Sequence, residues 1–111
     1  MTRDKLKDRR NGVNLDLVFR RGRYVVGFGF SESLQVNEIF ISSSRPGSDA
    51  EATARDAAIL ASLSLQHGVD FDALRASLTR DHEGGAASAI GAAMDVIARE
   101  IELMRAEAIE A

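Results

Sequence analysis

The sequence predicts a two-layer α+β domain, in which a three-stranded antiparallel meander is followed by three helices packed on one face of the sheet. Apolar residues alternate along the first half of the chain and recur at steps of three and four along the second half. A chain of 111 residues can bury one hydrophobic core. We expect that domain to span residues 13–108, after a flexible basic arm at 1–12.

The first predicted strand alternates apolar and polar side chains, with Val13, Leu15, Leu17 and Phe19 on one face. Arg21-Gly22 follows as a turn, in which the glycine is free to adopt a positive φ. Short turns between successive strands predict antiparallel pairing, because parallel pairing needs a long crossover.

The second and third predicted strands are rich in aromatic and β-branched residues. Gly27 and Gly29 lie on one face of the second strand, which leaves that face bare and open to another backbone. The opposite face should pack under the helices. It carries Tyr24, Val26, Phe28 and Phe30, and the third strand runs from Val36 to Ile41.

Helix signals begin after a predicted loop at Ser42–Gly47. Ser48 and Glu51 form a capping box, in which the carboxylate is expected to reach back to the Ser48 amide. Small alanines recur on one face of this helix and allow close packing. The first helix should end near His67, before Gly68. Asp70 should cap a short second helix that runs through Leu78. A third helix, with a stripe of Ile and Met residues, should begin at Ser88.

Several function classes lack the residues they need. Without cysteine there is no disulfide and no thiolate nucleophile or metal ligand. His67 and His82 do not have the spacing of a zinc motif, and no serine lies in a nucleophile-elbow setting. We therefore expect no enzyme activity, no metal and no cofactor. The charged start and the lack of a long apolar run favour a cytoplasmic protein without a membrane segment.

Positive charge is concentrated at the start of the chain. Residues 1–24 carry a balance of +5 and the rest −8, within a net charge of −3. Such a basic arm is typical of nucleic-acid binding, although a solvated tail beside an acidic body has the same pattern. The candidate phosphate contacts are Arg9, Arg10, Arg20, Arg21 and Arg23, together with Arg3, Lys5 and Lys7.

A second candidate site lies at the junction before the first predicted helix. Free amides at a helix N-terminus attract anions, and a nearby arginine adds a fork of donors. The candidate residues for an anion or a nucleotide are Ser44, Arg45, Gly47 and Ser48. The alternative is a tight loop whose glycine permits the turn and whose serine caps the helix.

An ordered series of segments across residues 13–98 resembles the TSCPD domain, in the form found at the C-terminus of vitamin B12-dependent ribonucleotide reductases. The name-giving Thr-Ser-Cys-Pro-Asp is absent, and Ser44-Arg45-Pro46-Gly47-Ser48 stands in its place. The segments that carry the resemblance are Glu38-Ile39-Phe40-Ile41, Pro46-Gly47-Ser48, Ala54-Arg55-Asp56-Ala57-Ala58-Ile59-Leu60, Leu63-Ser64-Leu65-Gln66-His67-Gly68-Val69, Leu74-Arg75, Leu78-Thr79-Arg80, Ser88 and Ile90-Gly91-Ala92-Ala93-Met94-Asp95.

This resemblance implies a freestanding, non-catalytic accessory domain that binds or regulates a ribonucleotide reductase or another protein. The unpaired edges of a three-stranded sheet predict, in addition, a homodimer. The alternative function is a nucleic-acid or nucleotide-binding module that uses the basic arm and the Arg45–Ser48 helix terminus.

Overall fold

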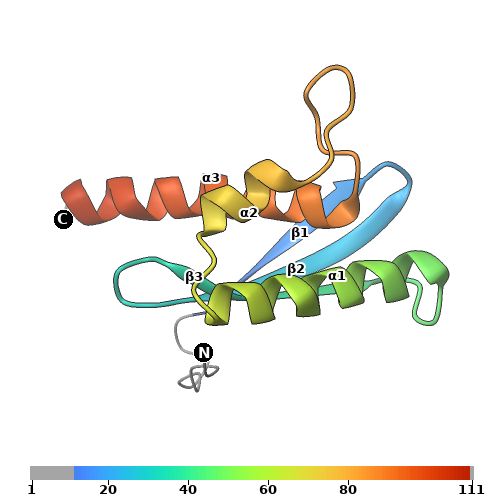
Figure 1. Ribbon diagram of the computed structural model, residues 1–111, viewed down its shortest axis with the longest axis horizontal. Coiled ribbons are helices and arrows are strands. Elements are labelled where there is room, and N and C mark those ends of the chain that lie inside the picture. The colour runs from blue at the N-terminus through green and yellow to red at the C-terminus, as the bar shows by residue number, and fades with distance from the viewer. Residues whose placement is uncertain (1–11, 111) are drawn as a thin grey trace.

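A computed structural model of the chain describes residues 12–110 and has the predicted α+β fold (Figure 1). An antiparallel sheet in the order β1-β2-β3 precedes the helices, which pack against it. The basic arm was predicted at residues 1–12. Residues 1–11 lie outside the described part of the chain, and Gly12 belongs to β1. The elements are β1 (Gly12–Phe19), β2 (Gly22–Phe30), β3 (Val36–Ser43), α1 (Asp49–Gln66), α2 (Phe71–Ser77) and α3 (Ala89–Glu110).

The β1–β2 turn lies one residue earlier than the sequence predicts. Arg20 and Arg21 form the two-residue loop, and Gly22 pairs with Phe19 inside the ladder. Arg20, with φ 54°, adopts the positive φ that was assigned to Gly22. Its side chain is anchored, since the guanidinium lies 5.0 Å from the centre of the Phe19 ring and donates to the Ala87 carbonyl at 3.3 Å. A Cβ on Gly22 would lie 2.7 Å from the Tyr24 ring, so this glycine makes room for an aromatic side chain.

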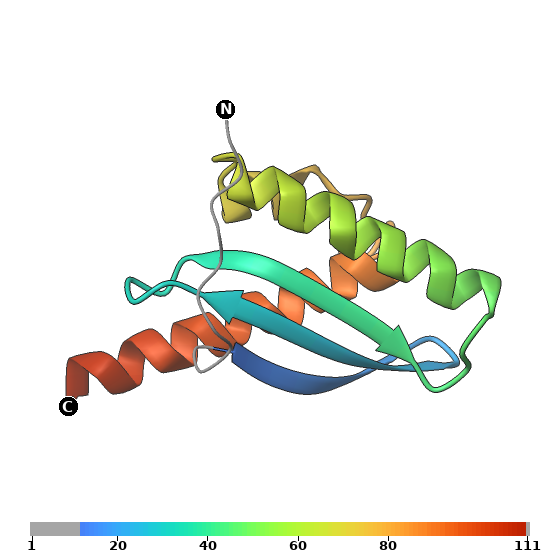
Figure 2. The same ribbon diagram turned by 90° about the horizontal axis from the view of Figure 1, so that it is seen from below.

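One face of the sheet forms the core, as predicted. The α3 helix crosses that face, while α1 runs alongside β3 (Figure 2). Side chains from all three strands and both long helices meet there: Leu17, Tyr24, Val26, Phe28, Val36, Ile39, Ile41, Ala54, Ala58, Ala61, Ala93, Met94, Ile97 and Ile101. The predicted Ile/Met stripe of α3 therefore lies in the core: Met94 and Ile97 are completely buried, and Ile101 is nearly so.

The opposite face of the sheet is less bare than the two glycines suggested. Gly27 is buried, because the Asn14 side chain and the Phe40 ring lie over it from the two neighbouring strands. Val18, Val25 and Phe40 remain partly exposed on this face. Side chains of the sheet itself thus fill the space beside Gly27. The prediction that another backbone approaches closely there was wrong.

The α1 helix closes the outer edge of β3 with side-chain hydrogen bonds. The Ser62 hydroxyl accepts from the Ile39 amide at 2.9 Å, and its single proton is shared between the Ile39 carbonyl at 3.0 Å and the Ala58 carbonyl of its own helix at 2.9 Å. Gln66 Nε2 donates to the Asn37 carbonyl at 2.9 Å, one helical turn further on. Because Ala54, Ala58 and Ala61 are small and buried, the helix can approach the strand closely enough for these bonds to form.

The helix boundaries agree with their predicted caps. Ser48 accepts from the Glu51 amide, Asp70 accepts from the Ala73 amide, and Gly68 adopts the positive φ of a C-terminal cap. Ser42 and Ser43 belong to β3, because its pairing with β2 continues to Tyr24, so the loop begins later than predicted. The α3 helix runs to Glu110, two residues past the expected end of the domain.

A charged cluster fixes α2 and the following loop to α3. Asp95 accepts from Arg75 Nε at 2.8 Å and from Arg80 Nη1 at 2.6 Å. These two guanidinium groups, Arg80 first, lower the pKa of Asp95 below its usual value. The projecting loop between α2 and α3, visible at the top of Figure 1, is thus held at its base by an ion pair.

We expect Ser62→Ala to destabilise the protein by about 1–3 kcal/mol, because it leaves a buried amide and carbonyl of β3 without a partner. Chemical denaturation measures this difference. Ser64→Ala is the matched control: that hydroxyl bonds only to the Leu60 carbonyl of its own helix, and its loss should change stability by less than about 0.5 kcal/mol. Equal effects of the two substitutions would contradict the edge closure.

Candidate functional site

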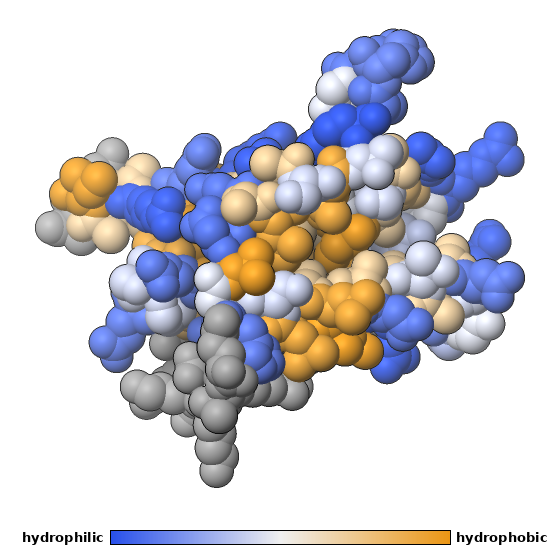
Figure 3. Space-filling view, in the orientation of Figure 1, coloured by the Kyte–Doolittle hydropathy of each residue, from blue (hydrophilic) through white to orange (hydrophobic). Residues whose placement is uncertain are grey.

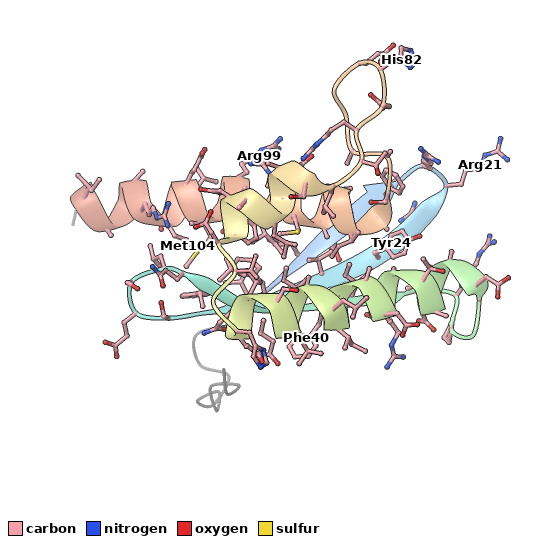
Figure 4. All side chains as sticks on the ribbon, in the orientation of Figure 1. Arg21, Tyr24, Phe40, His82, Arg99 and Met104 are labelled. Atoms are coloured by element: carbon pink, nitrogen blue, oxygen red, sulfur yellow. The ribbon has the colours of Figure 1, made fainter. Side chains whose placement is uncertain are left out.

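A hollow of about 430 Å³ lies where the β1–β2 turn meets the connection from β3 to α1. The two segments are adjacent because the Ser44 amide continues the ladder and donates to the Arg23 carbonyl at 3.3 Å. Figure 4 shows Arg21 at the tip of this turn and Tyr24 further along β2. The lining residues are Phe19, Arg20, Arg21, Gly22, Arg23, Tyr24, Ser43, Ser44, Arg45, Ser48 and Ala50. We call this site the arginine hollow.

Two separately predicted groups of site residues converge here. Arg20, Arg21 and Arg23 come from the predicted basic region, and Ser44, Arg45 and Ser48 come from the predicted anion site. The sequence did not join them, although an antiparallel meander places the first turn and the end of the third strand at the same end of a sheet. Phe19 and Tyr24, which contribute rings to the hollow, were predicted only as core residues.

The remaining predicted site residues divide into one that lies away from the hollow and others that the structure does not describe. Gly47 does not line it. Arg9 and Arg10, like the earlier Arg3, Lys5 and Lys7, lie outside the described residues. Of the predicted basic region, the structure thus describes Arg20, Arg21 and Arg23, and all three line the hollow.

The arginines of the hollow carry positive charge that no described carboxylate pairs. Within residues 12–110, ion pairs join Asp95 to Arg75 and Arg80, and no ion pair involves Arg20, Arg21, Arg23 or Arg45. Four of the nine arginines in this part of the chain thus surround one hollow. Unpaired guanidinium groups grouped in this way favour an anion.

Glu51 binds two amides of the connection, one of which, that of Gly47, belongs to the predicted anion site. Its carboxylate accepts from the Gly47 amide at 2.9 Å and from the Ser43 amide at 3.3 Å. It does not reach the Ser48 amide, as the predicted capping box required, because that amide faces the Arg45 carbonyl at 3.4 Å. The hydrogen bonds from Gly47 and Ser43 lower the pKa of Glu51. The Gly47 amide is therefore already bonded, and the arginines that line the hollow are the charged donors left for an incoming anion.

The serines divide into structural and available groups. Ser48 is engaged twice: its hydroxyl accepts from the Glu51 amide and donates to the Arg45 carbonyl at 3.0 Å. Ser43 Oγ accepts from the Arg45 amide, which leaves its own proton available for a ligand. The exposed Ser44 hydroxyl makes no hydrogen bond to a described residue. Ser43 and Ser44 can therefore donate to an anion beside the guanidinium groups.

The two aromatic rings that line the hollow are largely occupied within the chain. Tyr24 is 8% exposed and lies over Gly22, and the Phe19 ring is already covered by Arg20. Among residues 12–110, no group of three His, Cys, Asp or Glu side chains is placed to hold a metal ion. His82 is at the tip of the projecting loop and His67 bonds to the Leu63 carbonyl. The chemistry that this arrangement supports is anion binding.

An apolar surface lies away from the hollow. Figure 3 shows apolar side chains gathered over the middle of α1, where Ile59 is 55% and Leu60 is 66% exposed. No helix within residues 12–110 is long and apolar enough to cross a membrane.

Comparisons with known proteins identify no relative. No family model matches the chain, and neither a curated protein nor a solved structure matches it at a significant level. The resemblance to the TSCPD domain, and the link to ribonucleotide reductases that it implies, stay predictions from the residues alone.

We expect Glu51→Gln to lower the melting temperature at pH 7, since a neutral amide binds the Gly47 and Ser43 amides less strongly than a carboxylate. The lowered pKa sets the sign of the pH dependence. Stability from Glu51 is present above the ordinary glutamate pKa of about 4.3 and is lost as pH falls through the lowered folded value. The difference between wild type and variant should therefore shrink below about pH 4.

Thermal denaturation at several pH values measures this difference. Asp49→Asn is the control, because it removes the same charge from the same helical turn without removing a bond to the connection. A Glu51→Gln effect that stayed constant down to pH 2 would contradict the assigned role.

Proposed function

We propose that the protein is a non-catalytic binding module whose arginine hollow holds phosphate groups of a nucleic-acid backbone. The observation that carries the proposal is the convergence of Arg20, Arg21, Arg23 and Arg45 around one hollow without a carboxylate partner among the described residues. Arginine suits this ligand because its planar fork of donors matches the oxygens of a phosphate.

The shape of the hollow favours a backbone over a free nucleotide. Base recognition needs an exposed ring or a deep slot, and the Tyr24 ring is almost completely buried. Backbone phosphates need only charge and donors at the surface, which the guanidinium groups and Ser44 supply. The contact should therefore be independent of sequence.

Local charge outweighs the overall charge of the chain. The net charge of −3 repels a polyanion at long range. Close to the hollow, four guanidinium groups outnumber the two carboxylates of the first turn of α1, Asp49 and Glu51. Binding should consequently depend on these arginines and not on total charge, which makes the site separable by substitution.

The accessory role on a ribonucleotide reductase is a second proposal. The exposed Ile59 and Leu60 on α1 favour a protein contact of that kind, since apolar groups at a surface often mark an interface. A pull-down with a purified reductase, compared between wild type and an Ile59→Glu variant, tests it.

The main proposal is tested by fluorescence anisotropy with a labelled oligonucleotide in 20–50 mM salt. We expect Arg21→Glu combined with Arg45→Glu to weaken binding by at least about tenfold, since two favourable phosphate contacts become repulsive. The logarithm of the binding constant should fall with the logarithm of salt concentration with a slope of about −2 to −4, as three or four phosphate contacts require.

Arg99 on α3 provides the control, because it is exposed and well separated from the turn that carries Arg21 (Figure 4). The single Arg21→Glu variant is its matched partner: both substitutions change the net charge by the same amount, but Arg99→Glu should leave most of the affinity intact and Arg21→Glu should not. Equal weakening by Arg99→Glu and Arg21→Glu, or no binding by the wild type at low salt, would contradict the proposal. Competition by millimolar ATP but not by unlabelled oligonucleotide would assign the hollow to a free nucleotide instead.

A further inference from the structure

The two edges of the sheet differ in whether a helix bonds to their outward backbone groups. The outer edge of β3 is closed by Ser62, Gln66 and Glu51 of α1. Figure 2 shows α1 beside β3, whereas no described helix flanks the outer side of β1. Between Gly12 and Phe19 the strand has one charged residue, Asp16, and none of the lysines or prolines that protect free edges.

The hydrogen-bond pattern shows which groups of β1 point outward. Because Arg23 and Ser44 form a hydrogen-bonded pair, the odd-numbered residues of β2 direct their amides and carbonyls toward β3. The even-numbered ones from Gly22 to Phe28 then bond to their partners in β1, which are odd-numbered. The residues of β1 whose backbone groups point away from the sheet are therefore Gly12, Asn14, Asp16 and Val18.

We propose that this edge pairs with the same edge of a second copy, in antiparallel register with Leu15 on the two-fold axis, and so forms a six-stranded sheet. This register places Gly12 opposite Val18 and Asn14 opposite Asp16 of the second copy. All four outward residues of each strand then bond, with two hydrogen bonds in each of four pairs.

Neighbouring registers are less favourable. Centring the axis on Asp16 places two carboxylates directly opposite each other, which is destabilising. Centring it on Asn14 or on Leu17 moves some of the outward residues past the end of the other strand. In the Leu15 register each Asp16 faces an asparagine amide, which can donate to it.

Apolar contacts on the core face agree with the same register. Val13 and Leu15 are only half-buried in the single chain, whereas Leu17 is 7% exposed. The pairing brings Leu15 against Leu15, and Val13 against Leu17, of the second copy. These are non-hydrogen-bonded pairs, in which side chains approach most closely, so the pairing would complete the burial of the margin of the core. The proposal does not depend on the arginine hollow.

Sedimentation equilibrium and disulfide trapping test the proposal. The 12.0 kDa chain should show twice its mass at tens of micromolar and dissociate on dilution. Since the chain has no cysteine, Leu15→Cys introduces a single thiol per copy, and oxidation should link two copies across the axis. Val18→Cys is the control, because this register separates the two thiols by about 20 Å, and it should not cross-link.

Asp16→Pro removes one outward amide without removing a bond to β2, and should give a folded monomer. A wild-type monomer at 200 µM would overturn the proposal, as would equal cross-linking of the Leu15→Cys and Val18→Cys variants. Trapping of the Leu15→Cys dimer alone supports it even where the proline variant does not fold.

Discussion

The hydroxyl of Ser62 accepts from the Ile39 amide and shares its proton between the Ile39 and Ala58 carbonyls, and the packing of α1 against β3 depends on that contact. An edge strand has one row of backbone groups without a ladder partner, and those groups must be hydrogen-bonded or exposed to water. Here the side chains of α1 supply the partners. The helix must therefore run close to β3, which requires the buried alanines that face the strand.

The position of α1 against β3 also bears on where the candidate site forms. With α1 fixed against β3, the connection between them is held at one end of the sheet, where Glu51 binds the Gly47 and Ser43 amides. The same end of the sheet carries the β1–β2 turn, with Arg20 anchored on Phe19 and on the Ala87 carbonyl. The arginine hollow is the place where these two fixed segments meet. The Glu51 carboxylate bonds to the Gly47 and Ser43 amides and forms no ion pair with the arginines of the hollow, so their positive charge is not neutralised by it.

Local signals predicted the elements, and long-range contacts decided what the sequence could not. Alternation and capping residues such as Ser48 and Asp70 predicted the strands and helices, because each depends on neighbours a few residues away. The Arg20-Arg21 turn was misplaced by one residue, since Gly22 is required by the Tyr24 ring and not by backbone conformation. The register of β2 and β3 brings the segment that carries Arg45 beside Arg23, and it sets where Glu51 meets the Gly47 amide. No local sequence pattern contains this register.

Amide hydrogen exchange at several protein concentrations tests the contrast between the two edges most directly. The Ile39 amide should be as protected as the ladder amides of β2 at every concentration, because its partner is Ser62 of the same chain. The Asn14, Asp16 and Val18 amides should be protected at high concentration and exchange rapidly on dilution, because their partners belong to a second copy. Rapid exchange of Ile39, or protection of the three β1 amides that did not change with concentration, would contradict this account.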